Sequence, residues 1–261
     1  MAIRAVLEHT HLVTANDMSA LVWDADDALS LRRDARVIGT LVGPLRTDRP
    51  PRAAGSASKP HRKQPGALAL PPGTLPNRGL PLRLDAVMVF CLVLQGELVV
   101  EPGTEHAHDT LTNANDLIAF MDAQKQKENE RWLDDPFRAR VATLLALRRH
   151  QDPSSGTGLY IAPAMQYGVD YALYRADPMI THSDAMVRVL HEDAQEGGIP
   201  VRDWMAASRV ATNTQKALVY TRPKDDTSAL DDSAWLKGIV SSQAAPAASM
   251  VQAWTVQWTG W

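Results

Sequence analysis

The stretch YGVDYALYRADPMITHSDAMVRV, residues Tyr167–Val189, decides the fold that we expect for this chain of 261 residues. Apolar and polar residues alternate through Leu159–Tyr174 and again through Thr181–Leu190, which is the spacing of half-buried strands. Between the two runs lies Arg175–Pro178, whose Asp-Pro pair is typical of a turn. The pattern therefore predicts two antiparallel strands that are joined by one turn.

The chain downstream predicts further parts of the same sheet. Residues Ile199–Ala211 read as a helix, because a proline opens the segment and an aspartate lies in its first turn. A short apolar strand, Ala217–Tyr220, follows, and then a polar loop to about Ser233. The last apolar stretch, Met250–Trp258, alternates as a strand does.

The chain upstream predicts a smaller α/β unit. Ser19–Trp23 and Ala35–Leu41 read as short strands around an Asp-rich helix. The apolar segment Leu80–Val100 fits helix, strand or both. Asn113–His150 has a helical pattern that Pro136 interrupts.

These elements predict an α/β (α+β) fold with two domains, divided near residue 130. Residues 1–129 form an N-terminal α/β domain, and residues 130–261 form a domain with a central mixed sheet flanked by helices. Residues 43–77 hold eight of the 17 prolines and almost no large apolar side chains, so we expect a disordered insertion there. Its basic residues predict a solvated loop, and transient attraction to a polyanion is the alternative.

The overall composition excludes several classes of protein. Apolar residues make up 45% and charged residues 22% of the chain, which excludes a wholly disordered or coiled-coil protein. The net charge of -3 is unlike the basic profile of many nucleic-acid binders. The longest apolar run, Ala86–Leu94, is far shorter than the roughly 20 residues of a membrane-spanning helix. The single cysteine, Cys91, lies in that run and is expected to be a buried thiol.

The central stretch resembles the catalytic segment of the tRNA-splicing endonuclease family. That family carries a Tyr-x-x-Asp-Pro turn followed by His-Ser, and here Tyr174–Pro178 is followed by His182 and Ser183. The segment RVATNTQKALVY resembles the family's segment that ends in its catalytic lysine, which would be Lys216. Two positions depart from the pattern: Ala176 replaces a glycine of the turn and Gln215 replaces a basic residue.

The N-terminal part carries the same resemblance. ALVWDADDALSLRRDARVIGTLVG and NRGLPLRLDAVMVFCLVLQGELVV are similar to the start of the eukaryotic catalytic subunit that cuts the 3′ splice site. The resemblance implies a nuclear subunit that cleaves precursor tRNA and leaves a 2′,3′-cyclic phosphate and a 5′-hydroxyl. It also implies partners, namely a second catalytic subunit and one or two structural subunits.

Three residue types in the matching positions fit RNA cleavage without a metal. Such cleavage needs a base for the 2′-hydroxyl, an acid for the departing 5′-oxygen and a cation beside the phosphorane. Tyr174, His182 and Lys216 would supply these groups. A tyrosine is a weak base at neutral pH, so we expect the ammonium of Lys216 to favour the phenolate.

A second pair, Arg209 and Trp258, is similar to residues that sandwich an intron base in the family. Stacking on an aromatic ring contributes about 1–3 kcal/mol per base. Trp254 shares the strand face of Trp258, so either could be a core residue, and Trp261 is a competing candidate for the stacking role.

Two other functions fit parts of the pattern. A structural subunit of the same complex would keep the fold and lose the activity. A metal-dependent nuclease could use Asp177, Asp184 and Lys216. The acidic and histidine residues of the segment 105–109 read as a solvated loop, and we expect neither a metal nor another cofactor.

Overall fold

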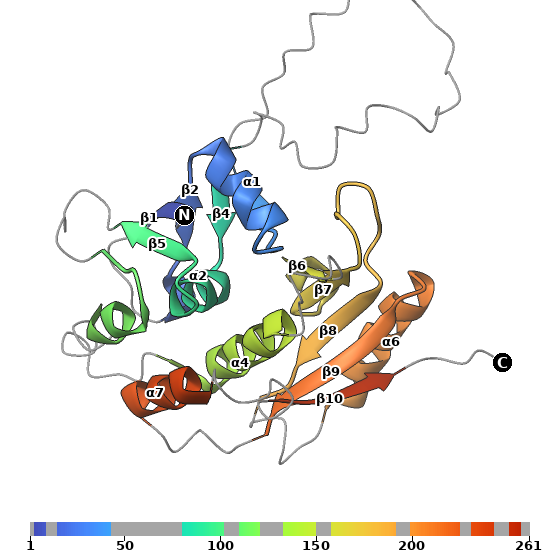
Figure 1. The fold of residues 1–261 in the computed structure, drawn as a ribbon. Helices are drawn as coiled ribbons and strands as arrows, with labels where there is room; N and C mark the ends of the chain where they lie inside the picture. The colour runs from blue at the N-terminus through green and yellow to red at the C-terminus, as the bar shows by residue number, and fades with distance from the viewer. Residues whose placement is uncertain are drawn as a thin grey trace, which may run out of the picture.

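Two five-stranded sheets, with helices between and beside them, make up the described part of the chain (Figure 1). A computed structural model describes nine segments, which are residues 3–8, 15–42, 80–101, 110–120, 133–149, 158–191, 199–224, 231–242 and 251–256. The predicted insertion at 43–77 and the predicted domain boundary near residue 130 lie outside these segments.

The N-terminal sheet is mixed and has the strand order β3-β4-β2-β1-β5. β1 pairs parallel with β5, and the other neighbouring strands of the sheet pair antiparallel. Its strands are β1 (Ile3–Leu7), β2 (Ala20–Val22), β3 (Thr40–Leu41), β4 (Leu82–Leu84) and β5 (Leu98–Glu101).

Two capped helices accompany this sheet. α1 (Ala25–Arg33) begins after Asp24, whose side chain accepts hydrogen bonds from the first backbone N–H groups of the helix. α2 (Ala86–Leu94) begins after Asp85 in the same way, and all of its residues are buried. A helix that is apolar on every side is stable only inside a core. The segment Leu80–Val100 is thus both strand and helix, and Cys91 is buried as expected.

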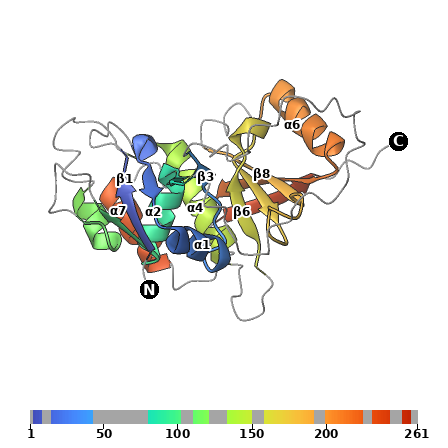
Figure 2. The same ribbon diagram turned by 90° about the horizontal axis from the view of Figure 1, so that it is seen from above.

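The C-terminal sheet is also mixed, with the order β10-β9-β8-β7-β6. The strands are β6 (Tyr160–Pro163), β7 (Tyr171–Tyr174), β8 (Ala185–Val189), β9 (Ala217–Pro223) and β10 (Val251–Val256). β8 and β9 are parallel, and α6 (Val201–Asn213) connects them. α6 covers one face of the sheet and α4 (Asp135–Arg149) lies against the other (Figure 2). The predicted α+β class, with an N-terminal domain and a C-terminal domain, is confirmed.

One buried cluster runs through both domains, and α4 lies at its centre. α4 contacts α2 on one side and β8, β9 and β10 on the other. α7 (Asp232–Ser242) closes the cluster, with the ring of Trp235 centred 6.5 Å from that of Phe90. The two domains therefore share a hydrophobic core.

Some predicted elements were wrong in detail. The segment Leu159–Tyr174 is two strands, because a 3-10 turn and Gly168, at a φ of 72°, reverse the chain between β6 and β7. β8 begins at Ala185, so the predicted strand residues 181–184 belong to a loop. Pro136 lies in the first turn of α4, where a missing N–H is tolerated, so a new helix begins at the predicted interruption.

No helix within the described segments has both the length and the apolar character that crossing a membrane requires.

Candidate active site

A pocket of about 860 Å³ opens at the end of the C-terminal sheet where β7 ends and where β8 and β9 begin. Tyr174, His182 and Lys216 all line it. The three residues come from separate elements, and the structure brings together the whole predicted catalytic set. The other described residues that line the pocket are Tyr167, Arg175, Pro178, Thr181, Ser183, Asp184, Met186, Thr214 and Gln215.

Lys216 reaches this pocket because β8 and β9 lie side by side. The pair Ala185 and Ala217 opens the parallel register, and the N–H of Ala217 donates to the carbonyl of Asp184 at 3.1 Å. Gln215, at a φ of 55°, turns the chain from α6 into β9 just before the lysine. Because α6 carries the chain back so that β8 and β9 run parallel, Lys216 lies beside the loop that contains Ser183, more than 30 residues earlier in the sequence.

The ammonium group of Lys216 is held within the pocket. Its Nζ donates a hydrogen bond to the backbone carbonyl of Ser183 at 2.7 Å. An ammonium has three donors, so two remain for another acceptor. This arrangement suits a cation that meets a phosphate next to His182.

Tyr174 lies at the end of β7 and is a neutral phenol at neutral pH. Burial raises the pKa of Tyr174, the neighbouring Tyr167 adds to the rise, and a hydrogen bond with the Ser183 side chain opposes it. We expected Lys216 to favour the phenolate, but the pKa is raised and Lys216 is not among the groups that shift it. The ammonium of Lys216 donates to the backbone carbonyl of Ser183.

Replacement of Tyr174 by phenylalanine is expected to make the protein less sensitive to alkali. A folded-state pKa above the unfolded value means that the folded state keeps its proton longer, so wild-type stability falls as the pH rises above about 10. Phenylalanine cannot ionise and lacks this contribution. Urea unfolding at pH 9 and at pH 10.5 measures the difference, and an equal loss of unfolding free energy in both proteins would contradict the assignment.

His182 lies in the β7–β8 loop, residues 175–184, and not in a strand as predicted. The two ends of this loop are tied together, because the carboxylate of Asp184 accepts the backbone N–H of Arg175 at 2.9 Å. The N–H of Asp184 also donates to the carbonyl of Leu173 at 2.8 Å. The loop is therefore closed at its base, and His182 faces the same pocket as Tyr174.

The predicted base sandwich is only partly described. Arg209 is an exposed residue of α6 and does not line the pocket. Trp258 and Trp261 lie outside the described residues. Trp254 of β10 is 44% exposed, so it is not a core residue, and the guanidinium carbon of Arg222 lies 5.5 Å from its ring centroid.

The two carboxylates of the metal-nuclease alternative are engaged with cations or N–H groups. Asp177 accepts hydrogen bonds from two guanidinium nitrogens of Arg32, and Asp184 is bonded to Arg175. Among the described residues, no cluster of three or more His, Cys, Asp and Glu side chains could hold a metal ion. The acidic and histidine residues at 105–109 lie outside the described segments.

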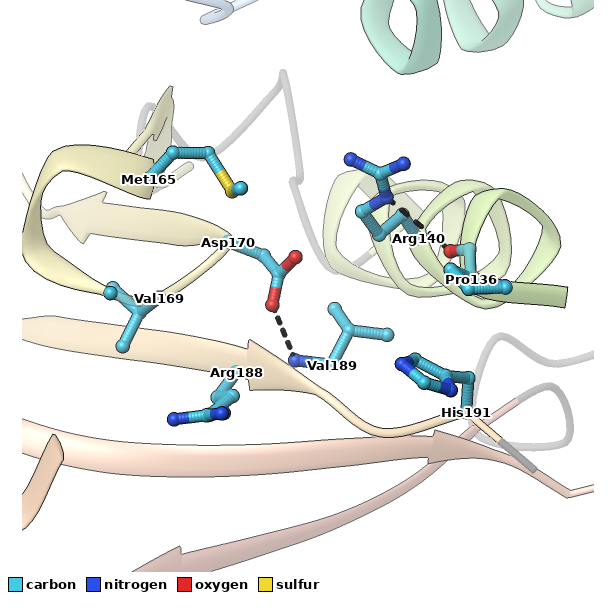
Figure 3. A pocket seen from close by; sticks show the side chains of 9 residues that line it. Pro136, Arg140, Met165, Val169, Asp170, Arg188, Val189 and His191 are labelled. Atoms are coloured by element: carbon cyan, nitrogen blue, oxygen red, sulfur yellow. Dashed lines mark hydrogen bonds between the residues drawn. The ribbon is translucent and has the colours of Figure 1, made fainter. Parts of the chain in front are cut away.

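A second pocket, of about 390 Å³, lies at the opposite end of β7 and β8 (Figure 3). Asp170 points into it and accepts the N–H of Val189 at 2.8 Å. Burial raises the pKa of Asp170, although this hydrogen bond and nearby cations oppose the rise. The described residues that line this pocket include His191 but no tyrosine or lysine, so they do not repeat the set of groups found in the first pocket.

One contact of the site had no signal in the sequence. Arg32 and Asp177 are 145 residues apart, and an arginine in the last turn of a helix is ordinarily explained by the helix dipole. Only the folded chain shows that this arginine reaches the loop that carries His182.

Comparisons with known proteins agree with this geometry. Residues 155–229 match the family model of the tRNA intron endonuclease, catalytic C-terminal domain, and this range includes Tyr174, His182 and Lys216. Residues 12–50 match the model of the TSEN34-like, N-terminal domain. A search of curated proteins found no match. Each of the two domains therefore matches a family model of the tRNA-splicing endonucleases, and the two matches together support that family.

Proposed function

We propose that this chain is a catalytic subunit of a tRNA-splicing endonuclease and that it cuts precursor tRNA at the 3′ splice site. The observation that carries the proposal is the convergence of Tyr174, His182 and Lys216 on one pocket. The match of residues 12–50 to a TSEN34-like domain supports the choice of junction, together with the N-terminal resemblance.

The three side chains have distinct roles in the proposed reaction. Tyr174, as the phenolate, accepts the proton of the 2′-hydroxyl, and the 2′-oxygen attacks the adjacent phosphorus. His182 donates a proton to the 5′-oxygen as its bond to phosphorus breaks. Lys216 stabilises the negative charge of the phosphorane with the donors that Ser183 leaves free. The products are a 2′,3′-cyclic phosphate and a 5′-hydroxyl.

The raised pKa of Tyr174 sets part of the barrier of this reaction. The phenol predominates at neutral pH, so formation of the phenolate is an uphill step. The phenol must therefore release its proton to solvent before Tyr174 can take the proton of the 2′-hydroxyl.

The cleavage is expected to persist when metals are removed. The protein, purified with its partner chains, is mixed with an intron-containing precursor tRNA in excess EDTA, and the ends of the products are identified. Cleavage at an intron boundary with a cyclic phosphate end supports the proposal. Activity that EDTA abolishes and Mg²⁺ restores would instead support the metal-dependent alternative.

The partners that we propose are a second catalytic subunit and one or two structural subunits. β10 is the last strand of its sheet, and four of its six residues are exposed. An exposed edge strand can extend a sheet by pairing with a strand of another chain. With a net charge of -3, the chain would rely on these partners to hold the body of the tRNA.

A further inference from the structure

The β7–β8 loop is built around Asp177. The carbonyl of Asp177 accepts the N–H of Thr181 at 3.1 Å, and its carboxylate accepts the N–H of Met179 at 2.8 Å. The hydroxyl of Thr181 donates to the same carbonyl. His182 is the residue after Thr181, so the hydrogen bonds of Asp177 help to fix the position of the His182 backbone and with it the imidazole.

Asp177 is itself held by an arginine of the other domain. Nε of Arg32, in the last turn of α1, donates to Oδ2 of Asp177 at 3.0 Å, and Nη2 donates to Oδ1. Only 10% of the Arg32 side chain and 12% of the Asp177 side chain are exposed. Two parallel hydrogen bonds fix the plane of a carboxylate as well as its place, and burial shields the pair from solvent.

The chain that follows Arg32 is attached to the C-terminal sheet. Val37 forms a parallel bridge with Ile161 of β6. The N–H of Ile161 donates to the carbonyl of Arg36 at 3.0 Å, and the N–H of Ile38 donates to the carbonyl of Ile161 at 3.0 Å. The arginine therefore approaches the loop from a segment that is itself fixed to the nuclease sheet.

We propose that Arg32 is a positioning residue for RNA cleavage, which acts by holding Asp177 and so fixing the loop between Tyr174 and His182. Arg32 lies within the TSEN34-like match and Asp177 within the endonuclease match. The N-terminal domain thus completes the active site of the C-terminal domain through Arg32, which is not among the described residues that line the pocket. The kinetic part of this inference rests on the proposed function, whereas the ordering of the loop does not.

Two isosteric variants test the inference. Asp177→Asn keeps the shape of the side chain and removes the charge that Arg32 binds. Asp232→Asn makes the same change in the Arg138–Asp232 pair, which is also buried and joins α4 to α7. In the complex purified with its partner chains, Asp177→Asn is expected to lower kcat by about 10- to 100-fold and to leave KM within about twofold. Asp232→Asn is expected to leave both constants of the folded protein unchanged.

Arg32 is tested by a conservative series. Arg32→Lys keeps the positive charge but loses the pair of parallel hydrogen bonds that the guanidinium makes. Its kcat is therefore expected to lie between those of wild type and Arg32→Gln. Hydrogen exchange supplies a measurement that needs no substrate. In Arg32→Gln and Asp177→Asn, the amides of residues 176–183 are expected to exchange faster, while the exchange of α7 stays as in wild type. In Asp232→Asn, α7 is expected to exchange faster, while residues 176–183 exchange as in wild type.

The outcomes separate this inference from the proposed function. If wild type cleaves, His182→Ala does not, and Asp177→Asn matches wild type in both kcat and loop exchange, Arg32 has no positioning role. An equal loss of kcat in Asp177→Asn and Asp232→Asn would also overturn it, because general destabilisation would then explain the effect. If wild type does not cleave precursor tRNA, the proposed function fails, and the exchange of residues 176–183 still decides whether Arg32 orders the loop.

Discussion

Replacement of His182 by alanine is expected to lower the rate constant for cleavage at one splice junction by about 100- to 10,000-fold, the usual contribution of a general acid. The departing 5′-oxygen would then have to leave as an alkoxide or take its proton from water. The loss is expected in the chemical step, because His182 would act on the departing oxygen, and RNA binding should change much less. Single-turnover cleavage of an intron-containing precursor tRNA, in EDTA, measures the rate at each junction.

His191→Ala is the matched control for this experiment. His191 lines the second pocket, at the far end of β7 and β8, and its replacement should leave both rates within about twofold of wild type, because it lies outside the acid-base set. If the 3′ junction alone remains uncut in His182→Ala, the proposed junction is supported. If both junctions are cut at the wild-type rate, His182 is structural and the chain is a structural subunit of the complex.

Replacement of Asp232 by alanine is expected to lower the free energy of unfolding by about 3–5 kcal/mol, a large part of the total stability of an ordinary domain. Nη2 of Arg138 lies 2.6 Å from Oδ1 of Asp232, and only 2% and 1% of the two side chains are exposed. The guanidinium carbon of Arg138 lies 5.4 Å from the ring centroid of Trp235. The alanine variant would remove the carboxylate that pairs with this buried guanidinium.

Urea unfolding, followed by circular dichroism, measures the change in stability. The exposed pair Arg33 and Asp34 provides the control, because 72% and 59% of these side chains are exposed and Asp34→Ala should hardly shift the midpoint. Replacement of both Arg138 and Asp232 by apolar residues of similar volume should recover much of the loss. A midpoint for Asp232→Ala equal to that of wild type would show that the buried pair contributes nothing.

The elements that the sequence predicted well are those with a local signal. α1, α6 and β9 have a capping residue, an opening proline or a short apolar run that marks them. The β6–β7 reversal was missed because its decisive feature is the backbone angle of Gly168, which one glycine in an apolar stretch does not reveal. α7 was missed because its start signal, Asp231, whose side chain accepts the N–H of Ala234, was read as part of the preceding polar loop.

The candidate site divides in the same way. The spacing between Tyr174 and His182 is a local property, so the sequence could pair them. Lys216 reaches the site because β8 and β9 pair in parallel. The hydrogen bonds from Arg32 to Asp177 depend on the packing of one domain against the other. The direction of the Tyr174 pKa shift follows from burial, which only the folded chain defines.

The hydrophobic core that α4 shares between the two sheets limits how the protein can be dissected. A fragment that began near residue 133 would contain every catalytic side chain, yet the face of α4 that packs on α2 would be open to water. Trp235 and Leu236 of α7 would lose part of their cover in the same way. An exposed apolar surface of this kind promotes aggregation. A portion suited to enzymology should therefore contain both domains, and insoluble expression of the shorter piece would say nothing about its chemistry.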